Sequence, residues 1–102
     1  MKDLKVGDEK WVIACRKTKN KLEFFPLLVE IYHLSKHKGG PIQDEYEYFM
    51  IYGKYQSKGQ TKETGRIFTY YENELDCKEA IEDKLNKFFN TELKNHPHFV
   101  MV

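Results

Sequence analysis

The stretch that decides the fold is RIFTYYENELDCKEAIEDKL, residues 66–85. Apolar residues alternate with polar ones as far as Tyr71, and from Cys77 onward they recur at the spacing of one helical face. This change of period predicts a strand that passes into an amphipathic helix within about four residues. Acidic residues crowd the changeover: Glu72, Glu74, Asp76, Glu79, Glu82 and Asp83.

These acids fit the requirements of a helix start. Asp76 precedes Glu79 by three residues, as in a D-x-x-E variant of the capping box, and acids near a helix N-terminus also suit its dipole. Glu72 and Glu74 would lie on the same side of an extended strand, where two carboxylates could bind a hard cation. With no phosphate loop or sugar-binding groove beside them, we interpret them as a solvated acidic patch. The helix is predicted over residues 77–93.

Four strands and a short fifth one are predicted, at residues 9–16, 27–34, 46–52, 66–71 and 98–102. The first carries apolar residues on both faces, as an interior strand does. Pro26 cannot donate a ladder hydrogen bond, so it is expected at a strand's beginning or on an edge. The glycine- and lysine-rich segment 35–41 is predicted as a loop, and segment 54–65 as a long hairpin tip or surface loop.

The predicted fold is α+β: a single domain over residues 1–102, with a strongly bent, barrel-like antiparallel sheet of four to five strands and one C-terminal helix packed on it. The expected core residues are Trp11, Ile13, Val29, Ile31, Phe49, Ile51, Phe68, Ile81, Leu85 and Phe88.

Charge and composition exclude few functional classes. The formal net charge is +1, with 13 Lys+Arg against 9 Asp+Glu in residues 1–66 and 4 against 7 in residues 67–102. Such a balance lacks the basic footprint of many nucleic-acid binders. No apolar run approaches the ~18 residues that span a bilayer, and the two cysteines fall in predicted strand and helix. A cytoplasmic protein without a membrane partner is expected.

No catalytic or metal-binding motif stands out. His33 and His37 are four apart but span a predicted strand end and loop, and no C-x-x-C or H-E-x-x-H occurs. Cys77 lies on the apolar stripe among carboxylates, which oppose a thiolate, so a buried structural cysteine is expected. We therefore predict no enzyme activity, no metal and no cofactor.

The unusual feature of the composition is 15 % aromatic residues, including seven tyrosines. Tyrosine presents a rigid apolar ring with a polar tip, which suits contact surfaces. We predict a module that binds another protein or a second copy of itself. The alternative is a nucleic-acid-binding barrel that uses tyrosines and basic loops. The candidate binding residues are Tyr46, Tyr48, Tyr52, Lys54, Tyr55, Lys58, Lys62, Arg66 and Tyr70.

Two segments resemble small Src-homology-3-type β-barrel domains of bacteria, phages and mobile elements. They are VGDEKWV within residues 5–15, and IFTYYENEL running into CKEAI within residues 66–81, together under a third of the chain. The resemblance implies that the Gly-Asp turn starts the first barrel strand and that a helix after the last strand plugs one end. The segment 54–65 and the long helix depart from that pattern and leave open a plain sheet packed on a helix. Compact, lysine- and tyrosine-rich single-domain chains such as this one are also similar to accessory proteins of phages and mobile elements, among them anti-CRISPR inhibitors.

Overall fold

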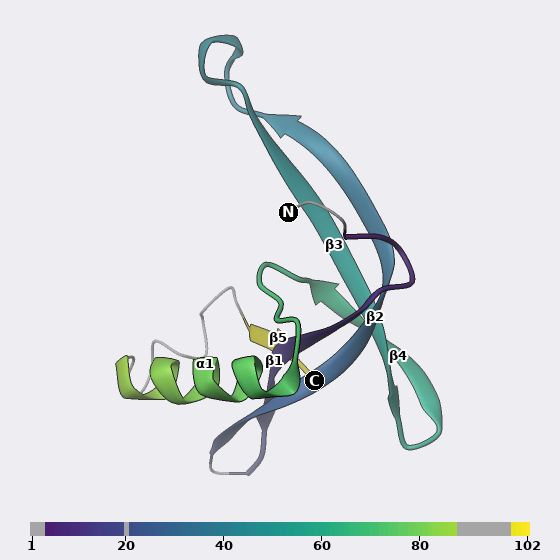
Figure 1. Cartoon of the computed structure of the whole chain (residues 1–102), viewed down its shortest axis with the longest axis vertical. Helices are drawn as coiled ribbons and strands as arrows, with labels where there is room; N and C mark the ends of the chain where they lie inside the picture. Colours follow the sequence, from purple (N-terminus) through teal and green to yellow (C-terminus); the bar gives the residue numbers. More distant parts are fainter. Residues whose placement is uncertain (1–3, 20, 88–98) are drawn as a thin grey trace.

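The structure, a computed structural model, describes residues 4–19, 21–87 and 99–102. Within them a five-stranded sheet in the order β4-β3-β2-β1-β5 curls into a half-barrel, and an α-helix packs against one of its faces (Figure 1). The elements are β1 (Glu9–Lys17), β2 (Leu22–Gly39), the 3₁₀ turn η1 (Ile42–Asp44), β3 (Tyr46–Ser57), β4 (Gln60–Arg66), α1 (Glu74–Lys87) and β5 (Phe99–Met101). The predicted α+β fold with a bent sheet and a C-terminal helix is confirmed. The sheet is mixed, because β5 runs parallel to β1.

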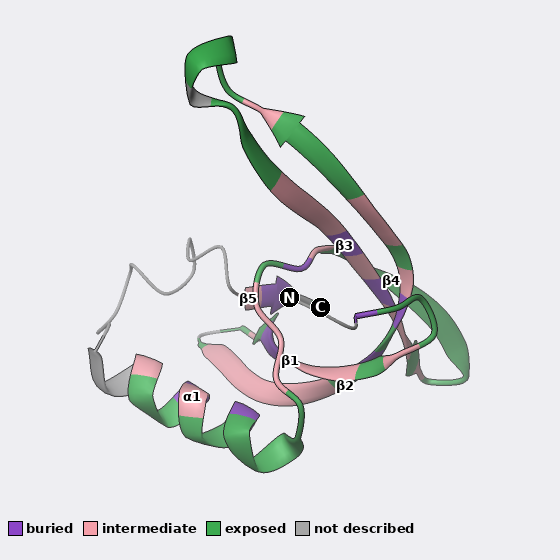
Figure 2. Cartoon of the chain, turned by 45° about the horizontal axis from the view of Figure 1, so that its top comes forward, coloured by how far each residue is buried: buried purple, intermediate pink, exposed green. Residues whose placement is uncertain are grey.

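The interior position predicted for the first strand is confirmed. β1 lies between β2 and β5, and it buries side chains on both faces (Figure 2). On the inner face of the half-barrel, Val12 packs with a cluster that includes Val29 and Ile31. On the outer face, Ile13 packs against Cys77 and Ile81 of α1. Each face of β1 therefore belongs to a different apolar cluster, which explains its continuous apolar sequence.

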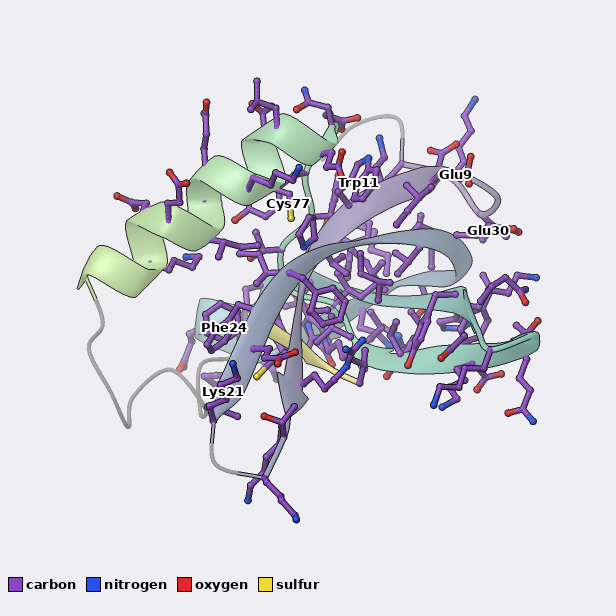
Figure 3. The ribbon with its side chains drawn as sticks, turned by 90° about the horizontal axis from the view of Figure 1, so that it is seen from below. Glu9, Trp11, Lys21, Phe24, Glu30 and Cys77 are labelled. Atoms are coloured by element: carbon purple, nitrogen blue, oxygen red, sulfur yellow. The ribbon has the colours of Figure 1, made fainter. Side chains whose placement is uncertain are left out.

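Figure 3 shows Cys77 projecting from α1 toward the sheet, with Phe24 of β2 and Trp11 of β1 on the same side of the sheet. Among the expected core residues, Ile13, Ile31 and Ile81 are buried, as are Val29 and Ile51. Phe68 was predicted wrongly, because half of its surface is exposed, and Trp11 and Phe49 are half-buried. The Leu85 side chain and Phe88 lie outside the described residues.

The strand predicted over residues 27–34 is longer than expected, since β2 runs from Leu22 to Gly39. Pro26 lies inside it, opposite Ile13, in the half of β2 that pairs with β1 but not with β3. Its missing N–H therefore removes no ladder bond to a second neighbour, in agreement with the expected edge position. The predicted loop 35–41 is mostly strand, and the chain turns at Gly40, whose φ is 87°.

Segment 54–65, predicted as a hairpin tip or surface loop, does form a hairpin, but most of it is strand. It contains the end of β3, a two-residue turn and most of β4. The turn consists of Lys58 and Gly59, both with positive φ (50° and 78°), which matches the twist of an antiparallel hairpin. β4 is an edge strand with mostly exposed polar side chains, so its sequence lacks the apolar alternation that reveals other strands.

The strand predicted over residues 66–71 is therefore displaced. β4 ends at Arg66, and the next residue, Ile67, is buried and donates its N–H to the Ile51 carbonyl at 2.8 Å. Tyr71 then forms an isolated antiparallel bridge with Trp11 through two backbone hydrogen bonds, of 2.9 and 2.7 Å. This segment carries the chain from β3 to β1, where the helix begins.

The helix start was placed three residues too late. Asn73, not Asp76, is the N-cap: its Oδ1 accepts from the Asp76 N–H at 2.8 Å, and its Nδ2 donates to Asp76 Oδ2 at 3.1 Å. Asp76 thus occupies the third helical position of a reciprocal cap. The interpretation of the acids as part of the helix start is supported at Glu74 and Asp76, which lie in the first turn. Residues 88–93 of the predicted helix lie outside the described residues.

Candidate functional site: the tyrosine–histidine face

The distal part of the β2–β3 hairpin, residues 33–52, extends away from the half-barrel as an arm (Figure 1). The register of the antiparallel β2–β3 pairing shifts at a bulge between Ile31 and His33. A bulge inserts an extra residue and so changes which side chains face the core. Beyond it, Leu34 and Phe49 pack on the inner cluster, and His33 and Tyr52 therefore belong to the opposite, outer face.

The outer face of the arm carries a continuous set of aromatic and polar side chains, which we name the tyrosine–histidine face. Its members are His33, Ser35, His37, Tyr46, Tyr48, Met50 and Tyr52. Cross-strand pairs organise it, because His37 stacks on Tyr48 with ring centroids 5.5 Å apart and 20° between the planes. His33 meets Tyr52 at 5.5 Å. Such pairs give a sheet surface a defined shape.

A hydrogen-bonded chain links the β2 side of this face. The Ser35 hydroxyl lies 3.1 Å from His33 Nε2 and 2.7 Å from His37 Nε2. The hydroxyl can accept a hydrogen bond from one imidazole and donate to the other. The two histidines therefore occupy one strand, two residues on either side of a serine. The sequence prediction had placed them across a strand end and a loop.

A glycine supports the tyrosines at the far end of the arm. Gly39 lies opposite Tyr46, and a Cβ built on it would meet the Tyr46 ring at 3.0 Å and the Tyr48 ring at 3.2 Å. The absence of a side chain thus lets both rings lie close to the strand. At the tip, the Ile42 side chain is 96 % exposed, and Tyr46 is 57 % exposed.

Arg66 lies at the end of the face away from the tip, opposite Tyr52. Its guanidinium lies 4.5 Å from the Phe68 ring centroid and 5.4 Å from that of Tyr48, and it donates to the Phe49 carbonyl at 2.9 Å. A cation between two aromatic rings is held by their π faces. A shallow hollow of about 440 Å³ lies here. It is lined by Tyr46, Tyr48, Met50 and Arg66.

The nine candidate binding residues do not form one surface. Tyr46, Tyr48, Tyr52, Lys54 and Arg66 lie on the outer face. Lys54 is engaged there with Glu30, at 3.7 Å between Nζ and Oε2.

The other four candidates lie elsewhere. Tyr55, Lys58 and Lys62 line a recess on the inner side of the sheet. Tyr70 packs on the inner cluster, with Lys10 Nζ 5.5 Å from its ring centroid.

Sequence reasoning missed the contribution of β2 to this face. His33, Ser35 and His37 show the period of two that marks one side of a strand, but the glycines that follow them favoured a loop. Phe68 was missed for a different reason: it was assigned to the core by alternation within a strand that does not form.

The two carboxylates Glu72 and Glu74 and the Cys77 thiol have structural roles. Glu72 pairs with Lys10 at 2.6 Å, and Glu74 lies 3.9 Å from Lys78. Burial is the main cause that raises the pKa of Cys77 to about 11, so its thiol is protonated at neutral pH. Within residues 4–19, 21–87 and 99–102, no cluster of three or more His, Cys, Asp or Glu side chains has the geometry of a metal site.

Comparison with protein-family models, with curated proteins and with solved structures finds no match to this chain. Among the described residues, α1 is too short and too polar to cross a membrane.

Proposed function

We propose that this protein is a non-enzymatic module that binds another protein through the tyrosine–histidine face of its arm. The observation that carries the proposal is the position of this face. It lies on a protruding hairpin, it is built of half-exposed rings, and it ends in a fully exposed isoleucine. Tyrosine is enriched at protein interfaces because a large ring makes contact with little loss of side-chain entropy.

The residues of this face belong to neither apolar cluster. The inner side of the arm contributes Leu34 and Phe49 to the inner cluster, and α1 packs on the outer side of β1. The rings of Tyr46 and Tyr48 contact each other, at 5.9 Å between centroids, and the Tyr48 ring also stacks on the imidazole of His37. Aromatic surface that does not stabilise the fold is typical of a recognition surface.

Nucleic-acid binding is the second candidate. Exposed tyrosines and a ring-stacked arginine are groups on which bases can stack. However, single-strand binders place their cations beside the stacking rings, and here Lys58 and Lys62 lie on the other side of the sheet from Tyr48. Lys36, on the arm itself, is paired with Glu47 at 2.7 Å. Protein binding is therefore the stronger proposal.

The class of target follows from the resemblance to accessory proteins of phages and mobile elements. We include in the proposal that the protein acts in the cytoplasm, and that its partner is a host or defence protein which it inhibits, in the manner of an anti-CRISPR protein. Self-association through the same face is the alternative within this proposal. The Src-homology-3-type relationship belongs to the same set of proposals.

The decisive experiment is a pull-down from host cytoplasm with three variants. Tyr48→Ala/Tyr52→Ala should lose a partner that the parent captures. Ile42→Asp should weaken capture without affecting folding, because Ile42 makes no buried contact. Glu79→Ala/Glu82→Ala, on the exposed side of α1, is the matched control and should capture the partner normally. Capture that survives both arm variants would refute the proposal.

A salt titration against random DNA and RNA separates the second candidate. Nucleic-acid binding through phosphate contacts weakens steeply as salt rises, because neutralised phosphates release counterions. We expect no such binding by the arm. Salt-sensitive binding that Tyr48→Ala abolishes would favour the nucleic-acid function instead.

A further inference from the structure

A second recess lies on the inner side of the sheet, away from the tyrosine–histidine face. It sits between the end of the β1–β2 hairpin and the β3–β4 hairpin, and its volume is about 430 Å³. Small-molecule sites commonly have volumes of about 300–1,000 Å³. The residues that define it are Arg16, Phe25, Leu27, Tyr55, Lys58 and Lys62.

The rim of the recess is positively charged. Arg16, Lys58 and Lys62 all line it, and within the described part of the chain no carboxylate lies within 4 Å of either lysine. Among the described residues, Glu23 is the acid paired with a cation of this rim. It lies 3.9 Å from Arg16 and 3.9 Å from Lys21, so one carboxylate is shared by two cations. The uncompensated charge favours a ligand with more than one negative charge.

The floor of the recess is apolar and aromatic. Leu27 and Tyr55 are half-buried and pack on the inner cluster, which holds them in place. Phe25 lies beneath the Arg16 guanidinium, with 4.8 Å to its ring centroid. The Arg16 guanidinium over Phe25 and the ring of Tyr55 are flat groups against which an aromatic ligand can stack.

The two lysines are presented by a well-defined hairpin. Lys58 and Gly59 form its two-residue turn with positive φ, and the Gln56 side-chain amide donates to the Thr61 hydroxyl at 2.8 Å across the strands. Lys62 pairs with Tyr55 in the strand register, so its side chain lies on the same face as the ring. Cation and aromatic floor are thus fixed relative to one another.

We infer that this recess binds a nucleoside phosphate. The flat base would lie against Tyr55 and the stacked Arg16–Phe25 pair, and the phosphate oxygens would accept hydrogen bonds from Lys58 and Lys62. A purely apolar ligand would leave the charges of Lys58 and Lys62 without compensation, and inorganic phosphate would leave the aromatic floor unused. The ligand is either a free nucleotide or one unit of a single-stranded nucleic acid, which share this chemistry. The inference does not depend on the function proposed for the arm.

The test is calorimetric titration of the intact protein with ATP, adenosine, tripolyphosphate and a short single-stranded oligonucleotide. Backbone amide shifts, recorded in parallel, should locate the ligand at Phe25, Tyr55 and Lys62. Adenosine and tripolyphosphate should each bind at least about tenfold more weakly than ATP, because each lacks one half of the contacts. Shifts at these amides with the oligonucleotide would identify a strand as a source of the ligand. Shifts with ATP alone would identify the free nucleotide.

Lys62→Glu should weaken ATP binding about tenfold, the effect of losing one hydrogen bond to a charged group. Lys5→Glu carries the same charge change on an exposed residue before β1, whereas the recess lies at that strand's other end, so it should leave the affinity unchanged. The inference is wrong if millimolar ATP does not bind. It is also wrong if tripolyphosphate binds as tightly as ATP, or if Lys5→Glu weakens binding as much as Lys62→Glu does.

Discussion

Lys10 and Glu72 form an ion pair, with 2.6 Å between Nζ and Oε2, that ties β1 to the segment leading into α1. The two residues flank the Trp11–Tyr71 bridge, so a side-chain contact reinforces the backbone contact next to it. The pair stands at the point where the chain changes from extended to helical structure.

The ion pair should make a small, pH-dependent contribution to stability. The hydrogen bond to Glu72 raises the pKa of Lys10 above 10.5. The contribution is therefore fully present below pH 10.5 and lost as the pH rises through the higher folded value. Lys10→Met should lower the free energy of unfolding by about 0.5–1 kcal/mol near neutral pH, since the Glu72 side chain is 69 % exposed.

Thermal unfolding of Lys10→Met and the parent from pH 7 upward checks this. Lys78→Met is the control, because its 3.9 Å pair with Glu74 is weaker. A difference between Lys10→Met and the parent that does not shrink as the pH rises past 10.5 would contradict the assignment.

The helix cap gives the second prediction. Asn73→Ala should destabilise the protein by about 1 kcal/mol, because the Asp76 N–H would lose its acceptor. Asp76→Ala should cost less, since that carboxylate contributes to the dipole and to the Asn73 side chain but caps no N–H among the hydrogen bonds observed. Chemical denaturation measures both, with Glu79→Ala as an exposed control. A larger loss of stability for Asp76→Ala than for Asn73→Ala would instead support Asp76 as the N-cap.

The apolar cluster between β1 and α1 gives the third prediction. Ile81 is 8 % exposed and packs with Ile13 and Cys77. Ile81→Asp should unfold the protein, because the carboxylate would be buried without a partner and would cost about 3 kcal/mol or more. Glu82→Ala, on the exposed side of α1, should change stability by less than about 0.5 kcal/mol. Circular dichroism melts decide the matter: an Ile81→Asp variant that melts like the parent would disprove the packing.

The two cysteine thiols give the fourth prediction. Cys15 and Cys77 are completely buried, and burial raises the pKa of both, that of Cys77 to about 11. Neither should react with a thiol reagent at pH 8 unless the protein opens, and both should react at once in denaturant. For Cys77 the neutral thiol is favoured in the folded state, so stability should fall between pH 9 and about pH 11. Rapid labelling of the native protein would contradict the described burial.

Two glycines give the fifth prediction, as a matched pair. Gly39→Ala would push its Cβ against the Tyr46 and Tyr48 rings on the arm, which can move into solvent. It should therefore disturb partner binding with little effect on melting. Gly53→Ala would instead meet Val29 at 3.0 Å and Ile67 at 3.1 Å in the core, with an expected cost of about 1–3 kcal/mol. Equal effects of the two substitutions on stability would contradict the separation of arm surface from core.

Patterns with a strong apolar period could be read directly from the sequence. The double-sided run around Val12 and Ile13 placed the first strand inside the sheet, and the stripe from Cys77 to Ile81 placed the helix against it. Both signals come from burial, which excludes polar residues wherever a side chain leaves water. The helix cap was displaced by three residues because Asn73 and Asp76 both suit a cap, and the local sequence does not choose between them.

The tertiary structure alone decided where the candidate binding residues lie. The bulge after Ile31 sets which side of β2 and β3 carries the tyrosines, and a shift of one residue would have exchanged the two faces. The tight turn at Lys58 and Gly59 makes a strand of a polar segment and carries Lys62 to the side opposite Tyr48. Pairing register depends on distant partners, whereas an apolar period depends on burial, and for that reason the residues could be named from the sequence but their grouping could not.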